Sequence, residues 1–341
     1  MKFDVVVGNP PYQQSRDDTR DDAIYNHFYD LAKDVSERYC LITPARFLFN
    51  AGSTDKKWNE KMLNDDSLKV ELFEQDSKKI FPNTDIKGGV AILYRDDSKS
   101  FGRIGVFTPH EELNAILRKV EKVMGESLGS IITGQGIYRF TKKMHEDNPE
   151  VSGILPKSHQ YDISTGVLGT LRGILFFEQK PDDGNSYMQI LGRYKSQRVK
   201  MWIRRDYVST PEGFDKWRVV FPKSNGSGKL GEPLSSPSVI EPLTGFTQTF
   251  LSMGAFEHKK EAENALVYVK SKFLRVMLGI LKITQDNPAS KWKYVPLQDF
   301  TDKSDIDWNC SQSDLDTQLY DKYGLSEKEI SFIEEKVKPM E

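Results

Sequence analysis

The stretch from residue 3 to residue 12 constrains the fold of this chain more than any other. Phe3 and the run Val5-Val6-Val7 place apolar, mostly β-branched side chains around Asp4, and Gly8 and two prolines then stop the run. This pattern predicts a short strand that is buried on both faces, as in a parallel sheet. The turn from Asn9 to Tyr12 then lies at the carboxyl end of that strand, which is where open α/β sheets bind ligands.

The tetrapeptide Asn9-Pro10-Pro11-Tyr12 resembles the catalytic motif of DNA methyltransferases that methylate an exocyclic amine, and the chemistry of that reaction explains its residue types. Such an amine is a poor nucleophile because its lone pair is delocalised into the ring. Two acceptors on its N–H bonds localise that pair and stabilise the charge that develops. The Asn9 side-chain oxygen and the Pro10 carbonyl are the candidate acceptors, and the prolines stiffen the turn. Tyr12 offers a face for a base flipped out of a duplex.

This tetrapeptide resembles the motif of DNA methyltransferases that act on adenine N6, of the bacterial restriction-modification type with the gamma-class motif order. The resemblance implies that Asn9, Pro10, Pro11 and Tyr12 are catalytic and that Asp4 and Gly8 support the turn. It implies S-adenosylmethionine as cofactor and double-stranded DNA as substrate. Phe81 matches the position that packs on the flipped base opposite Tyr12, although an aromatic residue before a strand is as often core.

Strand and helix patterns alternate after the turn. They predict a helix over residues 23–38, a parallel strand over 39–44, a short helix over 58–63 and strands over 69–73 and 88–94. Arg46, just after the second strand, matches a family loop beside the cofactor or base, where it can contact a phosphate or remain solvated. We expect an α/β protein: residues 1–108 form a partial Rossmann-like methyltransferase sheet, and residues 109–341 form a mixed α/β target-recognition domain that binds DNA.

Basic residues are concentrated in the second domain. The whole chain holds 48 basic and 50 acidic residues, whereas residues 188–231 hold ten Lys and Arg against three acids. Their alternation with aromatic residues predicts strands with one basic face, which can contact phosphates or guanine edges. A run of charge is otherwise a solvated face. The candidate DNA contacts are Arg193, Lys195, Arg198, Lys200, Arg204, Arg205, Lys216 and Arg218. Further along, we expect a long helix over 261–283 and a last helix with a capping box at Ser326 and Glu329.

A complete enzyme of the resembled family also has a cofactor half, with a strand, a Gly-rich turn, a helix and an acidic residue. Only eight residues precede Asn9, so we expect this half to be absent from the chain. Residues 226–231 fit G-x-G-x-x-G, but Pro233 and Pro237 break any helix that follows. Without its neighbours the first strand exposes an apolar edge. We expect a missing N-terminal half, a partner subunit or a second copy to pair there.

Composition narrows the classes of protein to which the chain can belong. No run of 18 apolar residues is present, which argues against a membrane protein. Two distant cysteines, Cys40 and Cys310, suggest reduced thiols in the cytoplasm, and the five histidines have no metal-ligand spacing. A restriction nuclease is a possible further partner. The main alternative is a catalytically inactive DNA-binding or specificity subunit with a relic motif, and methylation of RNA or of protein glutamine also stays open.

Overall fold

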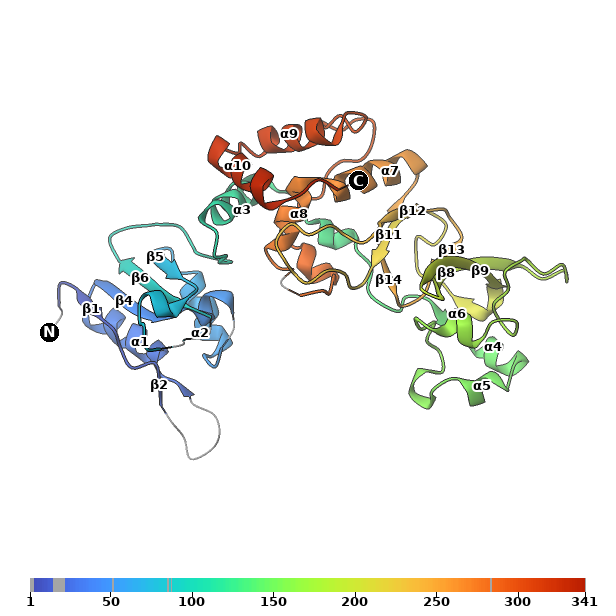
Figure 1. Cartoon of the computed structure of the whole chain (residues 1–341), viewed down its shortest axis with the longest axis horizontal. Helices are drawn as coiled ribbons and strands as arrows, with labels where there is room; N and C mark the ends of the chain where they lie inside the picture. The colour runs from blue at the N-terminus through green and yellow to red at the C-terminus, as the bar shows by residue number, and fades with distance from the viewer. Residues whose placement is uncertain are drawn as a thin grey trace. The chain divides into compact units, whose positions relative to one another are not determined.

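The computed structural model describes residues 3–14, 22–50, 52–84, 86, 88–282 and 284–340. The protein is a mixed α/β chain with several small sheets (Figure 1). It divides into two compact units, residues 1–114 and 115–341, and the boundary falls inside helix α3 (Glu111–Val123). No helix of the described part is long and apolar enough to cross a membrane.

The first unit is built on a four-stranded sheet with the order β1-β4-β6-β5. These strands are β1 (Val6–Gly8), β4 (Arg38–Pro44), β6 (Val90–Asp96) and β5 (Leu68–Glu74). β1 runs parallel to β4, as predicted, whereas β6 is antiparallel to both β4 and β5. Helix α1 (Tyr25–Val35) connects β1 to β4, and α2 (Lys56–Leu63) follows β4. The short strands β2 (Gln13–Gln14) and β3 (Asp22–Ala23) pair before α1.

The first strand is not buried on both faces, so that prediction is wrong for this chain. Val7 is 73% exposed, Phe3 56% and Val5 47%. Within the described residues β1 pairs only with β4, through Val6 opposite Tyr39 and Gly8 opposite Leu41. The strand therefore forms one edge of the sheet, as expected: Val6 packs partly against the core of the first unit, whereas Val5 and Val7 stay exposed.

Aromatic side chains fill the core behind the ends of β1 and β4. The rings of Phe47 and Trp58 lie 5.2 Å apart between centroids, and those of Tyr29 and Tyr39 lie 5.6 Å apart. Phe47 belongs to the short 3-10 turn Arg46–Phe49, which directly follows β4. The Tyr29 hydroxyl and the Thr43 hydroxyl share a buried hydrogen bond of 2.9 Å. The end of β4 is therefore held from behind by packed rings and a polar contact.

The second unit contains two three-stranded sheets. In one, the hairpin of β8 (Tyr187–Tyr194) and β9 (Gln197–Arg204) is joined by β13 (Thr244–Phe246). In the other, β11 (Trp217–Pro222) lies between β12 (Ser238–Ile240) and β14 (Phe250–Phe256). The short strands β7 (Arg139–Phe140) and β10 (Val208–Ser209) also pair.

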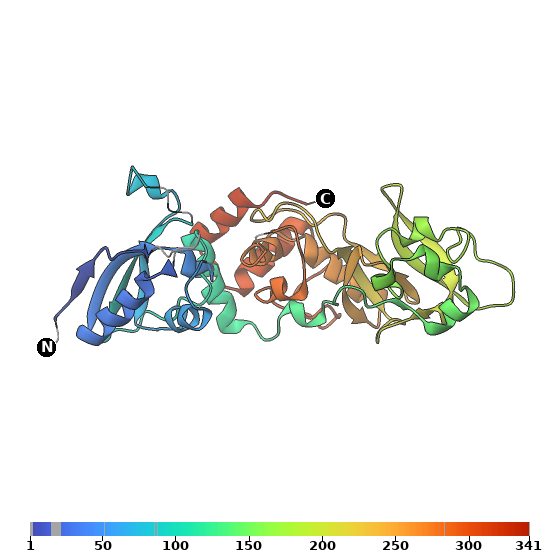
Figure 2. The same cartoon turned by 90° about the horizontal axis from the view of Figure 1, so that it is seen from below.

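Short helices accompany the β8–β9 sheet, and longer ones follow the second sheet in the chain. α4 (Lys142–Asp147), α5 (Val151–Ile154) and α6 (Val167–Thr170) lie beside the β8–β9 sheet in both views (Figures 1 and 2). After β14 come α7 (Lys259–Lys270), α8 (Lys272–Gly279), α9 (Gln312–Lys322) and α10 (Glu327–Lys336).

Two sequence expectations in this unit have clear outcomes. The helix predicted over 261–283 is broken at Ser271, which is extended (ψ 147°) and whose hydroxyl accepts a 3.0 Å hydrogen bond from the Leu274 N–H to begin α8. The capping box of the last helix is confirmed, because the Ser326 N–H donates to Glu329 Oε2 at 2.7 Å.

The buried hydroxyl pair in the first unit gives a test of this core. Tyr29→Phe and Thr43→Val should each lower the free energy of unfolding of the unit by about 1 kcal/mol, because each leaves one buried hydroxyl without its partner. The double variant should lose less than the sum, since both polar groups are then gone. Hydrogen exchange in peptides that cover β4 measures this unit separately from the second. A strictly additive double variant would argue against the hydrogen bond.

Candidate functional site

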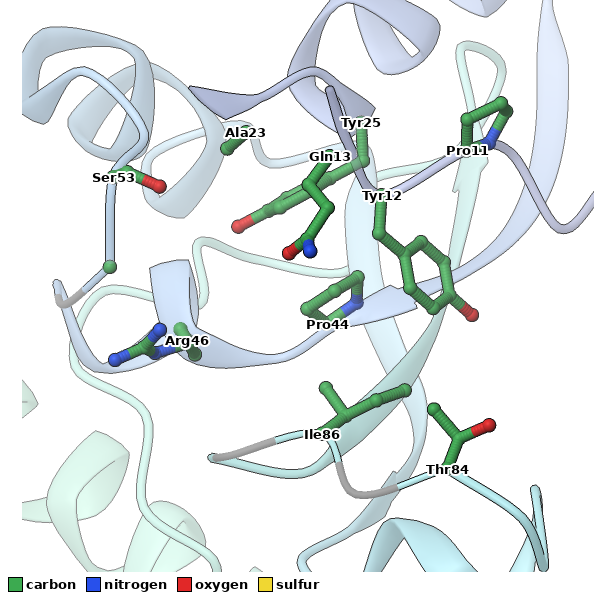
Figure 3. A pocket seen from close by; sticks show the side chains of 11 residues that line it. Pro11, Tyr12, Gln13, Ala23, Tyr25, Pro44, Arg46, Ser53, Thr84 and Ile86 are labelled. Atoms are coloured by element: carbon green, nitrogen blue, oxygen red, sulfur yellow. The ribbon is translucent and has the colours of Figure 1, made fainter. Parts of the chain in front are cut away.

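A cavity of about 640 Å³ opens beside the turn that follows β1, a size in the range of small-molecule sites (Figure 3). Four segments of the first unit line it: the turn after β1, the start of α1, the segment after β4 and the loop before β6. Its lining residues include Pro11, Tyr12, Tyr25, Pro44, Arg46 and Ile86. No Asp or Glu is among its described lining residues. Because β1 and β4 are parallel, their carboxyl ends meet here.

Tyr12 forms one wall of this cavity. Its main-chain carbonyl accepts a 3.1 Å hydrogen bond from the Ile24 N–H, which ties the turn to the segment that leads into α1. Burial raises the pKa of the Tyr12 phenol, and the nearby Asn9 side chain opposes this shift. The hydroxyl is shielded from solvent, yet no hydrogen bond of good geometry reaches it within the described residues. Tyr12 therefore presents a neutral ring.

The Asn-Pro-Pro-Tyr turn separates two hollows. Pro11 and Tyr12 line the large cavity, whereas Asn9 and Pro10 line a smaller, mainly apolar groove of about 230 Å³. The groove lies against β1, β4 and helix α1, with Leu31 in its wall. The Asn9 side chain is exposed. The four consecutive motif residues therefore face two different hollows, and Asn9 and Tyr12 do not line the same one.

Other predicted motif residues lie outside the cavity. Phe81 is half-buried, and its N–H donates a 2.7 Å hydrogen bond to the Ser77 carbonyl, while Ile86 of the same loop forms the wall. Asp4 is exposed. A methyl group at Gly8 would lie 3.9 Å from Leu41 Cδ2, an ordinary contact, so the packing gives no steric requirement for glycine there.

The structure adds cavity residues that the motif did not predict. Tyr25 is 4% exposed but still reaches the cavity wall, and Pro44 forms its centre (Figure 3). Burial raises the pKa of Tyr25, while a hydrogen bond with Thr54 and the charge of Arg46 oppose that rise. The only sequence signal for Tyr25 was its place at the start of a predicted amphipathic helix, and that signal equally fits a core residue.

The basic residues of the second unit follow the predicted alternation on the β8–β9 hairpin. Arg198, Lys200 and Arg204 alternate on β9 with Met201 and Ile203, which are buried. Arg193 on β8 pairs opposite Arg198, and Lys195 lies at the hairpin turn in a left-handed conformation (φ 48°).

Most of these basic side chains already form ion pairs or hydrogen bonds within the second unit. Lys200 pairs with Glu241 at 2.5 Å, Arg204 with Asp206 at 2.7 Å, and Lys216 with Glu257 at 2.5 Å. Arg198 donates to the Ser235 and Ser236 carbonyls, and Arg205 donates to the Val208 carbonyl and the Thr210 hydroxyl. Among the candidate contacts in the described chain, Arg193 and Lys195 at the hairpin tip are exposed and have no acidic partner, and Arg193 donates a 3.1 Å hydrogen bond to the Ser196 carbonyl in the same turn.

Arg218 has to be removed from the candidate surface contacts. It is 3% exposed and lies on the central strand β11. Its guanidinium donates to the Thr244 carbonyl at 2.8 Å, to the Phe214 carbonyl at 3.3 Å and to the Tyr138 hydroxyl. These protein acceptors use its hydrogen-bonding capacity inside the unit, so it cannot reach a phosphate without unfolding this region.

The loop of residues 226–231, which fits G-x-G-x-x-G, already binds a carboxylate of the same chain. The Glu232 carboxylate accepts hydrogen bonds from the Ser227 and Gly228 N–H groups, each at 2.8 Å. Lys282 forms an ion pair with the same carboxylate. Backbone amides that would otherwise hold a phosphate are therefore satisfied by the chain itself. The described residues also contain no group of three or more His, Cys, Asp or Glu side chains arranged to hold a metal.

Comparisons with known proteins point to one class. Residues 1–81 match the family described as Eco57I restriction-modification methylase. A 95-residue segment is 36% identical to an uncharacterized adenine-specific methylase of Mycoplasma pneumoniae, which corresponds to 26% of this chain and 22% of that protein. This chain thus spans about a fifth of the length of that relative. The N-terminal part of the chain is therefore similar to restriction-modification methylases.

Two solved structures align over 97% of this chain. One is the type IIG restriction endonuclease BpuSI, at 11% identity, 52% coverage of that chain and a TM-score of 0.32. The other is the type IIL restriction-modification enzyme MmeI in complex with DNA, at 10% identity, 56% coverage and a TM-score of 0.32. At these scores the alignments do not define the fold, and the similarity that carries weight is that of residues 1–81.

Proposed function

We propose that this chain holds and activates the target adenine in a DNA adenine-N6 methyltransferase of a restriction-modification system. The observation that carries the proposal is the cavity at the carboxyl ends of β1 and β4, bordered by the Asn-Pro-Pro-Tyr turn and open to solvent. The match of residues 1–81 to restriction-modification methylases supports it. The named relative, an adenine-specific methylase, supports adenine as the base.

In this proposal the flipped adenine enters the cavity and stacks on Tyr12. A neutral phenol ring suits an apolar stacking face. Asn9 and Pro10 line the adjoining groove in the structure, so in this proposal both turn toward the amino edge of the base. There the Asn9 side-chain oxygen accepts a hydrogen bond from one N–H and the Pro10 carbonyl accepts one from the other. These acceptors localise the nitrogen lone pair as the methyl group arrives. Phe81 would approach the opposite face of the base if the loop before β6 shifts.

S-adenosylmethionine supplies the methyl group in the proposed reaction. The described residues do not fit the whole cofactor, because no acidic side chain lines the cavity and the Gly-rich loop is occupied by Glu232. We therefore propose that a cofactor-binding half, a partner subunit or a second copy completes the site. The exposed edge with Phe3, Val5 and Val7 and the adjoining groove are the proposed contact surface. The second unit would bind double-stranded DNA, and a restriction nuclease is a further candidate partner.

The acceptor role of Asn9 has a direct test. The chain is expressed with its neighbouring genes in a host that lacks adenine methylation, and N6-methyladenine is mapped by single-molecule sequencing. Asn9→Ala should lower methylation at the recognised sequence about 10²–10³-fold, because it removes one preorganised acceptor. Asn64→Ala, on the exposed end of α2, is the control and should have no effect. A wild-type chain that methylates no sequence under these conditions would support the relic alternative.

Tyr12 can be tested by separating its ring from its hydroxyl. Tyr12→Phe should keep most of the activity, since no hydrogen bond of good geometry reaches the hydroxyl within the described residues. Tyr12→Ala should weaken capture of the flipped base by about 10- to 100-fold, the value of one base–aromatic stack. Fluorescence of 2-aminopurine at the target position measures capture. Equal losses in the two variants would contradict a stacking role.

The basic hairpin is tested by comparing cations with and without acidic partners. Arg193→Ala and Lys195→Ala should each reduce the salt dependence of DNA binding by about one unit in the log–log slope. Lys216→Ala should change it less, because Glu257 already pairs with this side chain. Affinities measured across a series of salt concentrations give the slopes. A larger effect of Lys216→Ala than of the two tip variants would exclude the hairpin tip as the main phosphate contact.

A further inference from the structure

Arg46 lies at the cavity, and its side chain has no hydrogen-bond or ion-pair partner among the residues that the structure describes. It is the first residue of the 3-10 turn after β4, and its side chain is exposed. Its guanidinium forms no hydrogen bond or ion pair with the described residues, and none of the described residues that line the cavity carries a carboxylate. Arg46 and Tyr12 lie on opposite sides of Pro44 (Figure 3). A cation therefore stands across the cavity from the proposed stacking face.

Two glycines leave room for the stem of this side chain. A methyl group at Gly88 would lie 2.7 Å from Arg46 Cγ, and one at Gly52 would lie 3.2 Å from Arg46 Cβ. Both have positive φ, 89° and 96°, which side-chain-bearing residues rarely adopt. The two glycines come from different loops, one after β4 and one before β6. Close approach of both loops thus confines the stem while the guanidinium stays accessible.

The 3-10 turn that carries Arg46 is held in place by buried side chains that follow Arg46. The next two residues, Phe47 and Leu48, are 0% and 1% exposed, and Phe47 packs within the aromatic core. Asn50 ends the turn in the left-handed conformation, and its side-chain oxygen accepts a 3.2 Å hydrogen bond from Asn59. The backbone under Arg46 therefore has little freedom, so the position of the guanidinium is set by the fold rather than by a mobile loop.

We propose that Arg46 binds the phosphate of the flipped nucleotide and so positions the adenosine in the cavity. This inference rests on the proposed function and adds the sugar-phosphate part of the substrate to it. A guanidinium forms a two-pronged contact with the oxygens of a phosphate, and such charge-assisted hydrogen bonds are the stronger ones. A carboxylate, such as that of an amino acid, offers a similar pair of oxygens. The phosphate is favoured because the aromatic wall for a base stands in the same cavity.

The test uses the full chain and small probes followed by ligand-observed NMR titration. Adenosine 5′-monophosphate should bind about tenfold more tightly than adenosine, at the lower end for a charged hydrogen bond because the site is open to water. Arg46→Gln should remove this tenfold advantage and leave the affinity for adenosine unchanged. Arg38→Gln, the same charge change at the other end of β4, should keep it. Inorganic phosphate should compete with the nucleotide more strongly than methionine does.

The outcomes separate this inference from the proposed function. If adenosine binds but the monophosphate binds no better, or if Arg46→Gln keeps the advantage, the phosphate role is wrong while the adenine cavity stands. If inorganic phosphate binds in an Arg46-dependent way and adenosine does not bind, the anion site stands and the adenine cavity fails. Competition by methionine equal to that by phosphate would overturn the choice of phosphate. Arg46→Lys, which keeps the charge but loses the planar fork, should retain only part of the advantage.

Discussion

The parallel pairing of β1 with β4 is the constraint on which the rest of the candidate site depends. It aligns the carboxyl ends of two strands, so the Asn9–Tyr12 turn and the Arg46–Phe49 turn lie next to each other at the same end of the sheet. The aromatic core behind β4 then fixes the second turn, and the hydrogen bond from Ile24 to the Tyr12 carbonyl fixes the first. The cavity is the space that these two anchored turns leave between them and the loop before β6.

The same pairing leaves the outer edge of β1 without a neighbouring strand among the described residues. β1 has one described neighbour, and Phe3, Val5 and Val7 remain largely in water. Burying an aliphatic or aromatic side chain of this size is worth roughly 1.5–3 kcal/mol, so covering this edge would be strongly favourable. The apolar groove that contains Asn9 and Pro10 adjoins the edge. A partner that covered it would therefore also surround the acceptor residues, which couples completion of the site to assembly.

Local patterns predicted much of this structure. The alternation of strands and helices in the first unit, the alternating faces of β9 and the capping box at Ser326 and Glu329 all follow from spacing along the chain. Spacing predicted the strand but not its place in the sheet, because three valines in a row look alike in a central strand and an edge strand; the exposed edge was expected only from the resemblance to methyltransferases. Nor could it predict the break at Ser271, since its hydroxyl cap replaces a helical turn without interrupting the apolar pattern.

The basic stretch illustrates a further limit, because charge along a sequence is not charge available at a surface. The partners that neutralise it are distant: Lys200 pairs with Glu241 and Lys216 with Glu257, each 41 residues away. The Arg218 guanidinium donates its hydrogen bonds to two carbonyls and a hydroxyl inside the unit. What stays accessible is concentrated at the β8–β9 turn. A nucleic-acid surface must supply cations without internal partners, so in this chain the fold selects among the basic residues that the sequence offers.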